Sequence, residues 1–303
     1  MRQAIERGLE YLLSRQASDG SFREMHGRNP GVVSFAVLSF MSTGTIPERG
    51  AHGRAVARGI DFVLSQAQPD GLIVNPNDTT KGTMYEHAIS TLLLTQAQGV
   101  YHRPGLLDVL KRAVDLIVAC QNRQGSWRFE PRPADGDLTV AVMQLVALRA
   151  AKSVGIHVPA ETFQAGARYA RRCATPAGGF LAQPGVGSVG YSRTAAGVCS
   201  LLTCGEYASP EVTGGIRYLQ ERKFADRRDK IHALYGLYYA AQVMHLTPDR
   251  RQWPMWFPTI RDELLAGQQQ DGHWDGEAGP VYGTAVNVLI LSMPYCYLPI
   301  HQH

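Results

Sequence analysis

Three segments of the chain repeat one pattern, Gln-x-x-x-Gly-x-aromatic. They span residues 16–22, 121–127 and 268–274, and each closes a run of apolar residues with helical spacing. Two weaker copies lie between them, at residues 67–71 and 174–180. A motif that recurs roughly every fifty residues indicates a repeat architecture, in which each copy belongs to one supersecondary unit.

Each motif is followed by a polar loop and a second apolar helix, so one repeat is a pair of helices. The second helices open at Ser34, His87, Thr139, Thr194, His232 and Thr284. Successive openings are 53, 52, 55, 38 and 52 residues apart. The short step falls where the fifth repeat, which runs from Gly215 to Lys230, lacks a glycine turn. The sequence therefore predicts six helix pairs, with the fifth abbreviated.

The two helices of a pair differ in where their apolar residues lie. The first helix is amphipathic, as in residues 5–13. The second helix, as in residues 35–41 and 140–148, is apolar on every side and must be buried. Six buried and six half-exposed helices predict an all-α fold, an (α/α)6 toroid with an inner barrel inside an outer ring. Neither chain end looks like the polar cap of a linear solenoid, so we expect residues 1–303 to close into a single-domain ring.

The motif itself has a structural explanation. A glutamine near a helix end can donate to the unpaired carbonyls there and accept from the first amides of the next helix. The aromatic side chain covers this contact, and the glycine provides the left-handed turn that ends the helix. The motifs therefore identify a fold and say nothing about chemistry.

These turns resemble the QW motifs of the prenyltransferase and squalene-cyclase repeat superfamily, and the resemblance covers essentially the whole chain. It implies the α/α-toroid fold. The superfamily includes class II terpene cyclases, the β-subunits of protein prenyltransferases and short stand-alone bacterial proteins, which this chain resembles most in length. Because one fold hosts many activities, function has to be argued from the site.

Composition and charge exclude several classes of function. The formal net charge is +4 and no run of Lys and Arg exceeds two residues, so we expect no nucleic-acid partner. No apolar run reaches the ~20 residues of a membrane span. Residues 1–7 read as part of the first helix rather than a signal peptide, which favours a cytoplasmic protein, although a trimmed leader would give the same start. Five scattered cysteines favour reduced, packed thiols, and we expect no metal and no cofactor.

The loops that enter the inner helices should gather at one rim, towards which six helix N-termini point. Aromatic, acidic and basic groups around such a mouth are the default binding-site hypothesis. The side chains expected to bind substrate there are Tyr85, His87, Tyr191, Arg193, His232, Tyr235 and Tyr282. Others near the rim in the sequence are Glu24, His26, Arg28, Glu86 and Asp229. The cavity should be apolar and its ligand a hydrophobic small molecule.

The segment Asp135-Gly-Asp137-Leu138-Thr139 resembles the Asp-x-Asp-Asp-Thr motif that opens an inner helix in class II terpene cyclases. The resemblance implies that Asp137 is the catalytic acid that protonates an alkene or epoxide, with Asp135 as the first aspartate. Two carboxyls that share one proton in a poorly solvated mouth can keep one of them neutral. Aromatic rings such as Tyr85 and Tyr282 would then stabilise a cation.

Two features depart from the cyclase pattern. Leu138 replaces the third aspartate, and the chain has one toroid where full cyclases enclose their substrate between two. The structural alternative for Asp135 and Asp137 is a role as N-cap and first-turn acid, which stabilises a helix start. An enzyme needs Asp137 buried and facing the cavity, whereas a scaffold tolerates it in solvent.

Three functional hypotheses remain open at this stage. The first is an isoprenoid-binding toroid that acts as a degenerate or partner-dependent cyclase, with a protein partner or a second toroid domain. The second is a non-catalytic ligand-binding or protein-interaction scaffold. The third is a polysaccharide lyase or hydrolase, which would use paired carboxylates or a Tyr, His and Arg set drawn from Tyr191, Arg193, His232, Asp135 and Asp137. A zinc prenyltransferase is disfavoured because the chain has no Asp-x-Cys pair, which leaves His87 and His232 as polar lining or caps.

Two C-terminal segments carry further expectations. Residues Trp253–Phe257 form a proline-interrupted apolar loop, which we interpret as a lid, a partner contact, a membrane-surface anchor or a cover over the barrel end. Residues 294–300 predict an extended strap across the ring, and His301–His303 a frayed tail.

Overall fold

The structure is a computed structural model that describes residues 1–78, 82–221 and 232–302. In this part of the chain every named element is helical. The outer helices are α1 (Arg2–Arg15), α3 (Gly50–Ser65), α5 (Leu106–Ala119), α7 (Ala160–Cys173), α9 (Pro210–Gln220) and α11 (Gln252–Ala266). The inner helices are α2 (Pro30–Met41), α4 (Thr83–Ala97), α6 (Leu138–Ser153), α8 (Tyr191–Thr203), α10 (Ala233–Leu246) and α12 (Pro280–Ser292).

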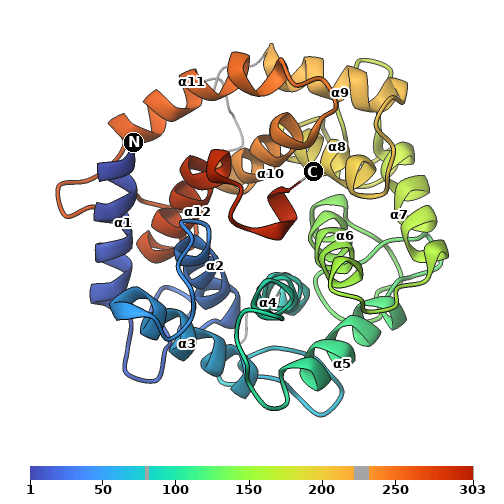
Figure 1. Cartoon of the computed structure of the whole chain (residues 1–303). Coiled ribbons are helices and arrows are strands. Elements are labelled where there is room, and N and C mark those ends of the chain that lie inside the picture. The colour runs from blue at the N-terminus through green and yellow to red at the C-terminus, as the bar shows by residue number, and fades with distance from the viewer. Residues whose placement is uncertain (79–81, 222–231, 303) are drawn as a thin grey trace.

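These helices form the predicted α/α toroid, with the inner helices arranged as a barrel inside the outer ring (Figure 1). Neighbouring inner helices pack against each other all the way round, including α12 against α2. The fifth outer helix, α9, has 11 residues and is the shortest of the α-helices in the described residues. The predicted end of its repeat at Lys230 lies outside the described residues.

Burial follows the apolar pattern of the two helix types. Every residue of α2 is buried, as is every residue of α12 after Pro280. The outer helix α7 buries one face only and exposes its arginines. Hydrophobic burial of the inner ring therefore holds the toroid together. All five cysteines are unpaired, and three of them are buried, in agreement with the expectation of packed thiols.

The glutamine of each strong motif joins two neighbouring outer helices. In the second copy, the Gln121 amide donates to the Gly125 carbonyl at 3.1 Å and to the Thr162 carbonyl in α7 at 2.9 Å. The Trp127 indole donates to the Ile117 carbonyl at 2.7 Å, which satisfies an unpaired carbonyl near the end of α5. The expectation that the glutamine accepts from the amides of the next helix is wrong. Its amide donates to a carbonyl in the first part of the next outer helix.

The same joint closes the ring between the last motif and the first helix. The Gln268 amide donates to the Ala4 carbonyl at 2.9 Å and to the Gly272 carbonyl at 2.8 Å. The Arg7 guanidinium adds a bond to the Gln269 carbonyl at 2.7 Å. The chain ends are thus tied by the same geometry as consecutive repeats.

This closure can be tested by replacing Gln268 with methionine, which has a similar size and no amide. Two carbonyls lose their donor, so we expect the free energy of unfolding to fall by about 1–3 kcal/mol. Gln121→Met should cost about the same, because the two joints are equivalent. Urea denaturation of both variants measures this. A loss at Gln121 with none at Gln268 would indicate an open ring.

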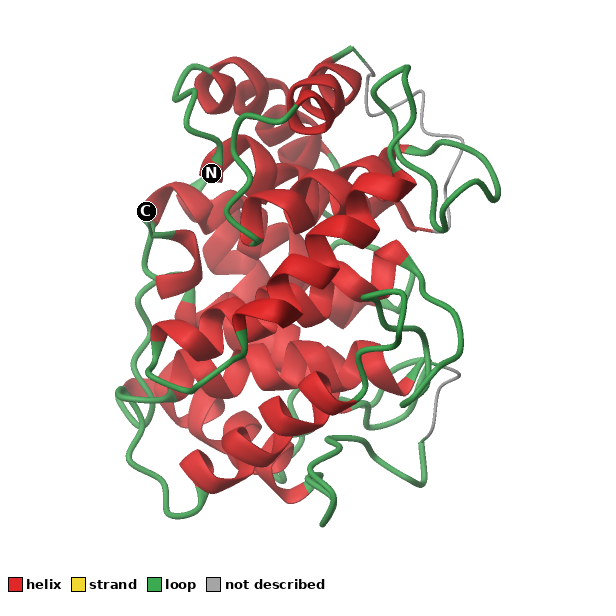
Figure 2. Ribbon diagram, turned by 90° about the vertical axis from the view of Figure 1, so that its right-hand side faces the viewer, coloured by secondary structure: helices red, strands yellow, loops and turns green. Residues whose placement is uncertain are grey.

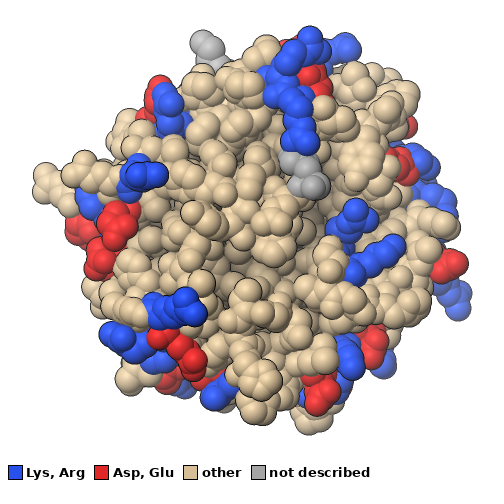
Figure 3. Space-filling model, viewed as in Figure 1, with Lys and Arg blue, Asp and Glu red and all other residues tan. Residues whose placement is uncertain are grey.

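The long loops that enter the inner helices lie at one end of the barrel, and the C-terminus lies at the other end (Figure 2). The C-terminal segment forms two short 3₁₀ helices, Met293–Tyr295 and Pro299–His301. It crosses the ring near the ends of α4 and α10, where the Ile300 amide donates to Gln96 at 3.2 Å. Charged side chains lie mostly around the edge of this face (Figure 3).

His301 is part of this cover and is not frayed. Its side chain is 1% exposed, and burial, aided by nearby His245, lowers its pKa to about 3. The imidazole is therefore neutral at pH 7. The expectation of a frayed tail at His301 is wrong because the neutral ring can be packed against the barrel end.

The Trp253–Phe257 segment is not a loop. It forms the start of α11, and Trp253 stacks on Phe257 with ring centroids 4.4 Å apart. Trp256 and Phe257 are buried against the core. Packing of these rings overturns the interpretation of the segment as a loop and gives no support to the membrane-anchor, lid and partner-contact interpretations. No described helix combines the length and hydrophobicity needed to cross a bilayer.

Candidate functional site

A cavity of about 600 Å³ opens at the end of the barrel where the inner helices begin. Its inner wall is apolar and aromatic, and its rim is polar. The wall comprises Val32, Phe35, Ile89, Phe129 and Met143, with the rings of Tyr85, Tyr235 and Tyr282. The polar groups at the rim are His26, Asn29, Glu86, Thr139, His232 and Glu277. A concave apolar space of this size with a few converging polar groups is typical of a small-molecule site.

Three of the predicted tyrosines do line this cavity. The Tyr235 hydroxyl donates to the Thr139 carbonyl at 2.5 Å, and the Tyr85 hydroxyl lies 2.9 Å from the Thr139 hydroxyl. Tyr282 packs edge-on against Phe35, with ring centroids 5.3 Å apart. Burial raises the pKa of all three phenols, so they stay neutral at any physiological pH.

Asp137 is the N-cap of α6. Its Oδ1 atom accepts hydrogen bonds from the Thr139 amide at 2.8 Å and from the Thr139 hydroxyl at 2.6 Å. The side chain is half-buried, next to the cavity lining rather than in it. Because Thr139 also contacts Tyr85, a hydrogen-bonded series runs from Asp137 to a side chain that lines the cavity.

Asp135 lies apart from this series. Its carboxylate pairs with Arg128 and accepts from Gln183 at 3.3 Å, beside a separate surface pocket. The Arg128 hydrogen bond holds the pKa of Asp135 below its usual range. Asp135 is therefore ionised and bound to a cation, and the expected sharing of a proton with Asp137 is not what the structure shows.

His87 does not line the cavity. It is fully buried between α4 and α5, where its Nδ1 accepts from the Ile73 amide at 3.1 Å. Its Nε2 then carries the hydrogen and donates to the Ala113 carbonyl at 3.1 Å. Burial lowers the pKa of His87 to about 4, so the ring is a neutral tie between two layers. The expectation that His87 contacts substrate is thereby corrected.

The remaining predicted residues divide between the cavity and the outside. His232 lines the cavity, with its ring 6.4 Å from that of Tyr235. Tyr191 is buried in the first turn of α8 and is not among the described lining residues. Arg193 donates to the Ser188 carbonyl at 2.9 Å, in the loop that precedes α8. Tyr191 and Arg193 are therefore not part of this site, in contrast to the expectation.

Glu277 was not predicted from the sequence. It lies in the loop before α12, and its Oε1 accepts from the Tyr235 amide at 3.0 Å and from the Tyr282 hydroxyl at 3.5 Å. The rim residues named from the sequence included Glu24, His26 and Arg28 from the loop before α2, but none from the loop before α12 that lies ahead of Pro280. Glu277 lies three residues before Pro280, and its side chain bonds to the neighbouring helix α10. Finding it from the sequence would have required every residue of the loop between the motif and the helix to be considered.

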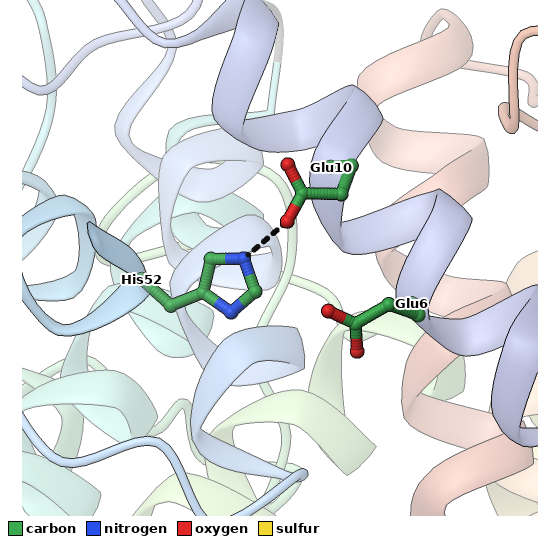
Figure 4. Close-up of side chains that lie close together, drawn as sticks. All are labelled: Glu6, Glu10 and His52. Atoms are coloured by element: carbon green, nitrogen blue, oxygen red, sulfur yellow. Dashed lines mark hydrogen bonds and ion pairs between the residues drawn. The ribbon is translucent and has the colours of Figure 1, made fainter. Parts of the chain in front are cut away.

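A second group of titratable side chains lies on the outer surface. Ligand atoms of Glu6, Glu10 and His52 are within 4.8 Å of one another, and both glutamates are exposed (Figure 4). His52 is hydrogen-bonded to Glu10 at 3.0 Å. This contact ties α1 to α3, and it is separate from the cavity lining.

Comparison with known proteins identifies the fold without identifying a family. No protein-family model and no curated protein sequence matches the chain. Solved structures do match over nearly their whole length. Type II terpene cyclase MstE from Scytonema, in an aspartate-to-asparagine variant bound to its substrate geranylgeranyl dihydroxybenzoate, has a TM-score of 0.66 at 13% identity, with 97% of each chain covered. The chain is an α/α toroid.

Other matches have different activities. Cellobiose 2-epimerase from Bacillus thermoamylovorans has a TM-score of 0.68 at 12% identity, covering 96% of this chain and 98% of that one. An α-amylase from Clostridium perfringens has a TM-score of 0.69 at 9% identity, covering 95% and 97%. The toroid fold is therefore shared with terpene cyclases, epimerases and hydrolases.

Proposed function

We propose that this toroid binds an isoprenoid-type ligand in its central cavity and cyclises it after protonation of an alkene by Asp137. The final carbocation loses a proton to water, and the Asp137 carboxylate regains one from solvent. The observation that carries the proposal is the cavity wall, which combines aliphatic side chains with five aromatic rings. Each methylene of a ligand buried against such a wall contributes about 0.8 kcal/mol. Aromatic faces also stabilise a carbocation that forms along an isoprenoid chain.

The proposed acid, Asp137, is half-buried beside the cavity lining and is linked to it through Thr139 and Tyr85. Its Oδ1 accepts both hydrogen bonds from Thr139, while Oδ2 accepts none from the described residues. A carboxyl in this arrangement has one oxygen held by donors and the other available to carry a proton.

A carbohydrate-active site has less support. Sugar-binding grooves use exposed tryptophan platforms, whereas Trp127 and Trp274 are buried in the turn motifs and Trp256 is buried on the inner face of α11. None of the described residues that line the cavity is a tryptophan. Asp135 is also unsuited to a carboxylate pair, because Arg128 binds it.

Ligand binding can be tested by filling the cavity. Ile89 is buried and lines the apolar wall, so Ile89→Trp should occupy the space of an isoprenoid chain and weaken geranylgeraniol binding at least about tenfold. Val100→Trp is the matched control, because Val100 is exposed and outside the lining. Isothermal titration calorimetry of both variants measures the difference. Equal affinities in the two variants would place the ligand elsewhere and contradict the proposal.

A further inference from the structure

The cavity mouth is surrounded by the N-termini of inner helices. The N-terminus of a helix carries a partial positive charge and unpaired amides, so it commonly binds phosphate and other anions. A ring of such ends would suit an isoprenoid diphosphate. Whether it does so here depends on what already occupies these amides.

The protein's own oxygens occupy four of these helix starts. Asn29 caps α2 and Asp137 caps α6, each accepting an amide hydrogen bond of 2.8 Å. Glu277 accepts from the first turn of α10 at 3.0 Å. Glu24 accepts from the first turn of α12, while burial raises its pKa. Three of the four groups are carboxyls, so the dipole field of the mouth is already compensated by acidic side chains.

Among the described residues of the entering loops, three arginines are engaged elsewhere. Arg28 pairs with Asp19 at 3.2 Å, Arg128 pairs with Asp135, and Arg193 donates to a loop carbonyl. The described residues that line the cavity include two glutamates and no lysine or arginine. A diphosphate at this mouth would therefore lie beside two glutamates, with no lysine or arginine among the described lining residues to balance its charge.

Glu277 also has a free acceptor position. Both of its hydrogen bonds, from Tyr235 and Tyr282, go to Oε1. A carboxylate has about four lone-pair sites on its two oxygens, so Oε2 can accept from a ligand. A hydroxyl or phenol can donate such a bond, whereas an ionised diphosphate offers only acceptors and repels the carboxylate.

We infer that the cavity selects an isoprenoid whose polar end is uncharged and donates a hydrogen bond, and that Glu277 is the residue that excludes a diphosphate. This inference rests on the proposed binding of an isoprenoid in the cavity. It adds the chemical class of the polar end and the residue that recognises it.

The test compares two probes with the same C20 chain, geranylgeraniol and geranylgeranyl diphosphate, by titration calorimetry on the full chain. We expect the alcohol to bind at least about tenfold more tightly. Glu277→Gln keeps the size of the side chain and an oxygen for the Tyr235 amide, and it should reduce this preference to near unity. The matched control is Asp115→Asn, which removes the same charge from an exposed position on α5 and should leave the preference unchanged. Titrations are run with and without Mg²⁺, because a metal ion can bridge carboxylates and a diphosphate.

Each remaining outcome has a defined meaning. Tighter binding of the diphosphate, in either buffer, overturns the inference and leaves the proposed isoprenoid site intact. A preference for the alcohol that persists in Glu277→Gln overturns the role of Glu277. If neither probe binds, the inference and the proposed function both fail.

Discussion

A valine at Gly125 should lower the free energy of unfolding by about 2–5 kcal/mol. Gly125 has a φ angle of 86°, a left-handed conformation that costs other residues about 1–2 kcal/mol. A Cβ atom at this position would also lie 2.4 Å from the Ala165 carbonyl oxygen in α7, and relieving such overpacking costs about 1–3 kcal/mol. Urea denaturation followed by circular dichroism measures the change.

Gly99 provides the control for backbone strain alone. Its φ angle is 92°, but no atom lies within 4 Å of the position that a Cβ would take. Gly99→Val should therefore cost only the conformational part, about 1–2 kcal/mol. If both variants lose the same stability, the close approach of the turn to the next outer helix does not explain why the motif has a glycine.

Asparagine at Asp137 should remove turnover of geranylgeraniol, with a loss of about 10²–10⁴-fold or more, because the proton donor is lost. Stability should change little, since asparagine caps helices as well as aspartate does. Product formation followed by gas chromatography, together with thermal unfolding, measures both effects.

Asp137→Ala separates catalysis from capping. It removes the acceptor for the Thr139 amide and should cost about 0.5–2 kcal/mol of stability while geranylgeraniol still binds. Wild-type turnover that survives in Asp137→Asn would contradict the role of Asp137 as the acid. No turnover by the wild-type protein, together with binding of geranylgeraniol, would favour a binding protein that is not an enzyme.

The fold could be predicted because its determinants are local and repeated. Each inner helix is apolar on every side, and each strong motif supplies the same glutamine joint, so the pattern is visible at any of its copies. The direction of the joint was missed, because an amide side chain can both donate and accept and the sequence does not show which group it meets.

The segment around Trp253 was misassigned for a related reason. Its two prolines indicated a loop, yet Pro254 falls in the first turn of α11. Backbone N–H groups in the first turn have no acceptor within the helix, so a proline there costs no hydrogen bond. Pro258 lies inside the same helix, and packing of Trp256 and Phe257 on the core outweighs the local preference. Tertiary contacts decided the outcome.

The candidate site was predicted less well than the fold. Tyr85, Tyr235 and Tyr282 were found because they lie in the first turns of inner helices that face the cavity. His87 occupies an equivalent place in the sequence but points to the outer layer, because one residue along a helix turns a side chain by about 100°. Glu277 was missed since it acts on α10 from the loop of another repeat.

The central claim is that the aromatic cavity is the site of an isoprenoid-type ligand, and a crystal structure of the protein grown with geranylgeraniol tests it most directly. We predict density for the hydrocarbon chain between Phe35, Met143 and Tyr282, with the hydroxyl near Glu277. A cavity that contains only water under saturating ligand, or a ligand bound elsewhere on the toroid, would contradict the claim.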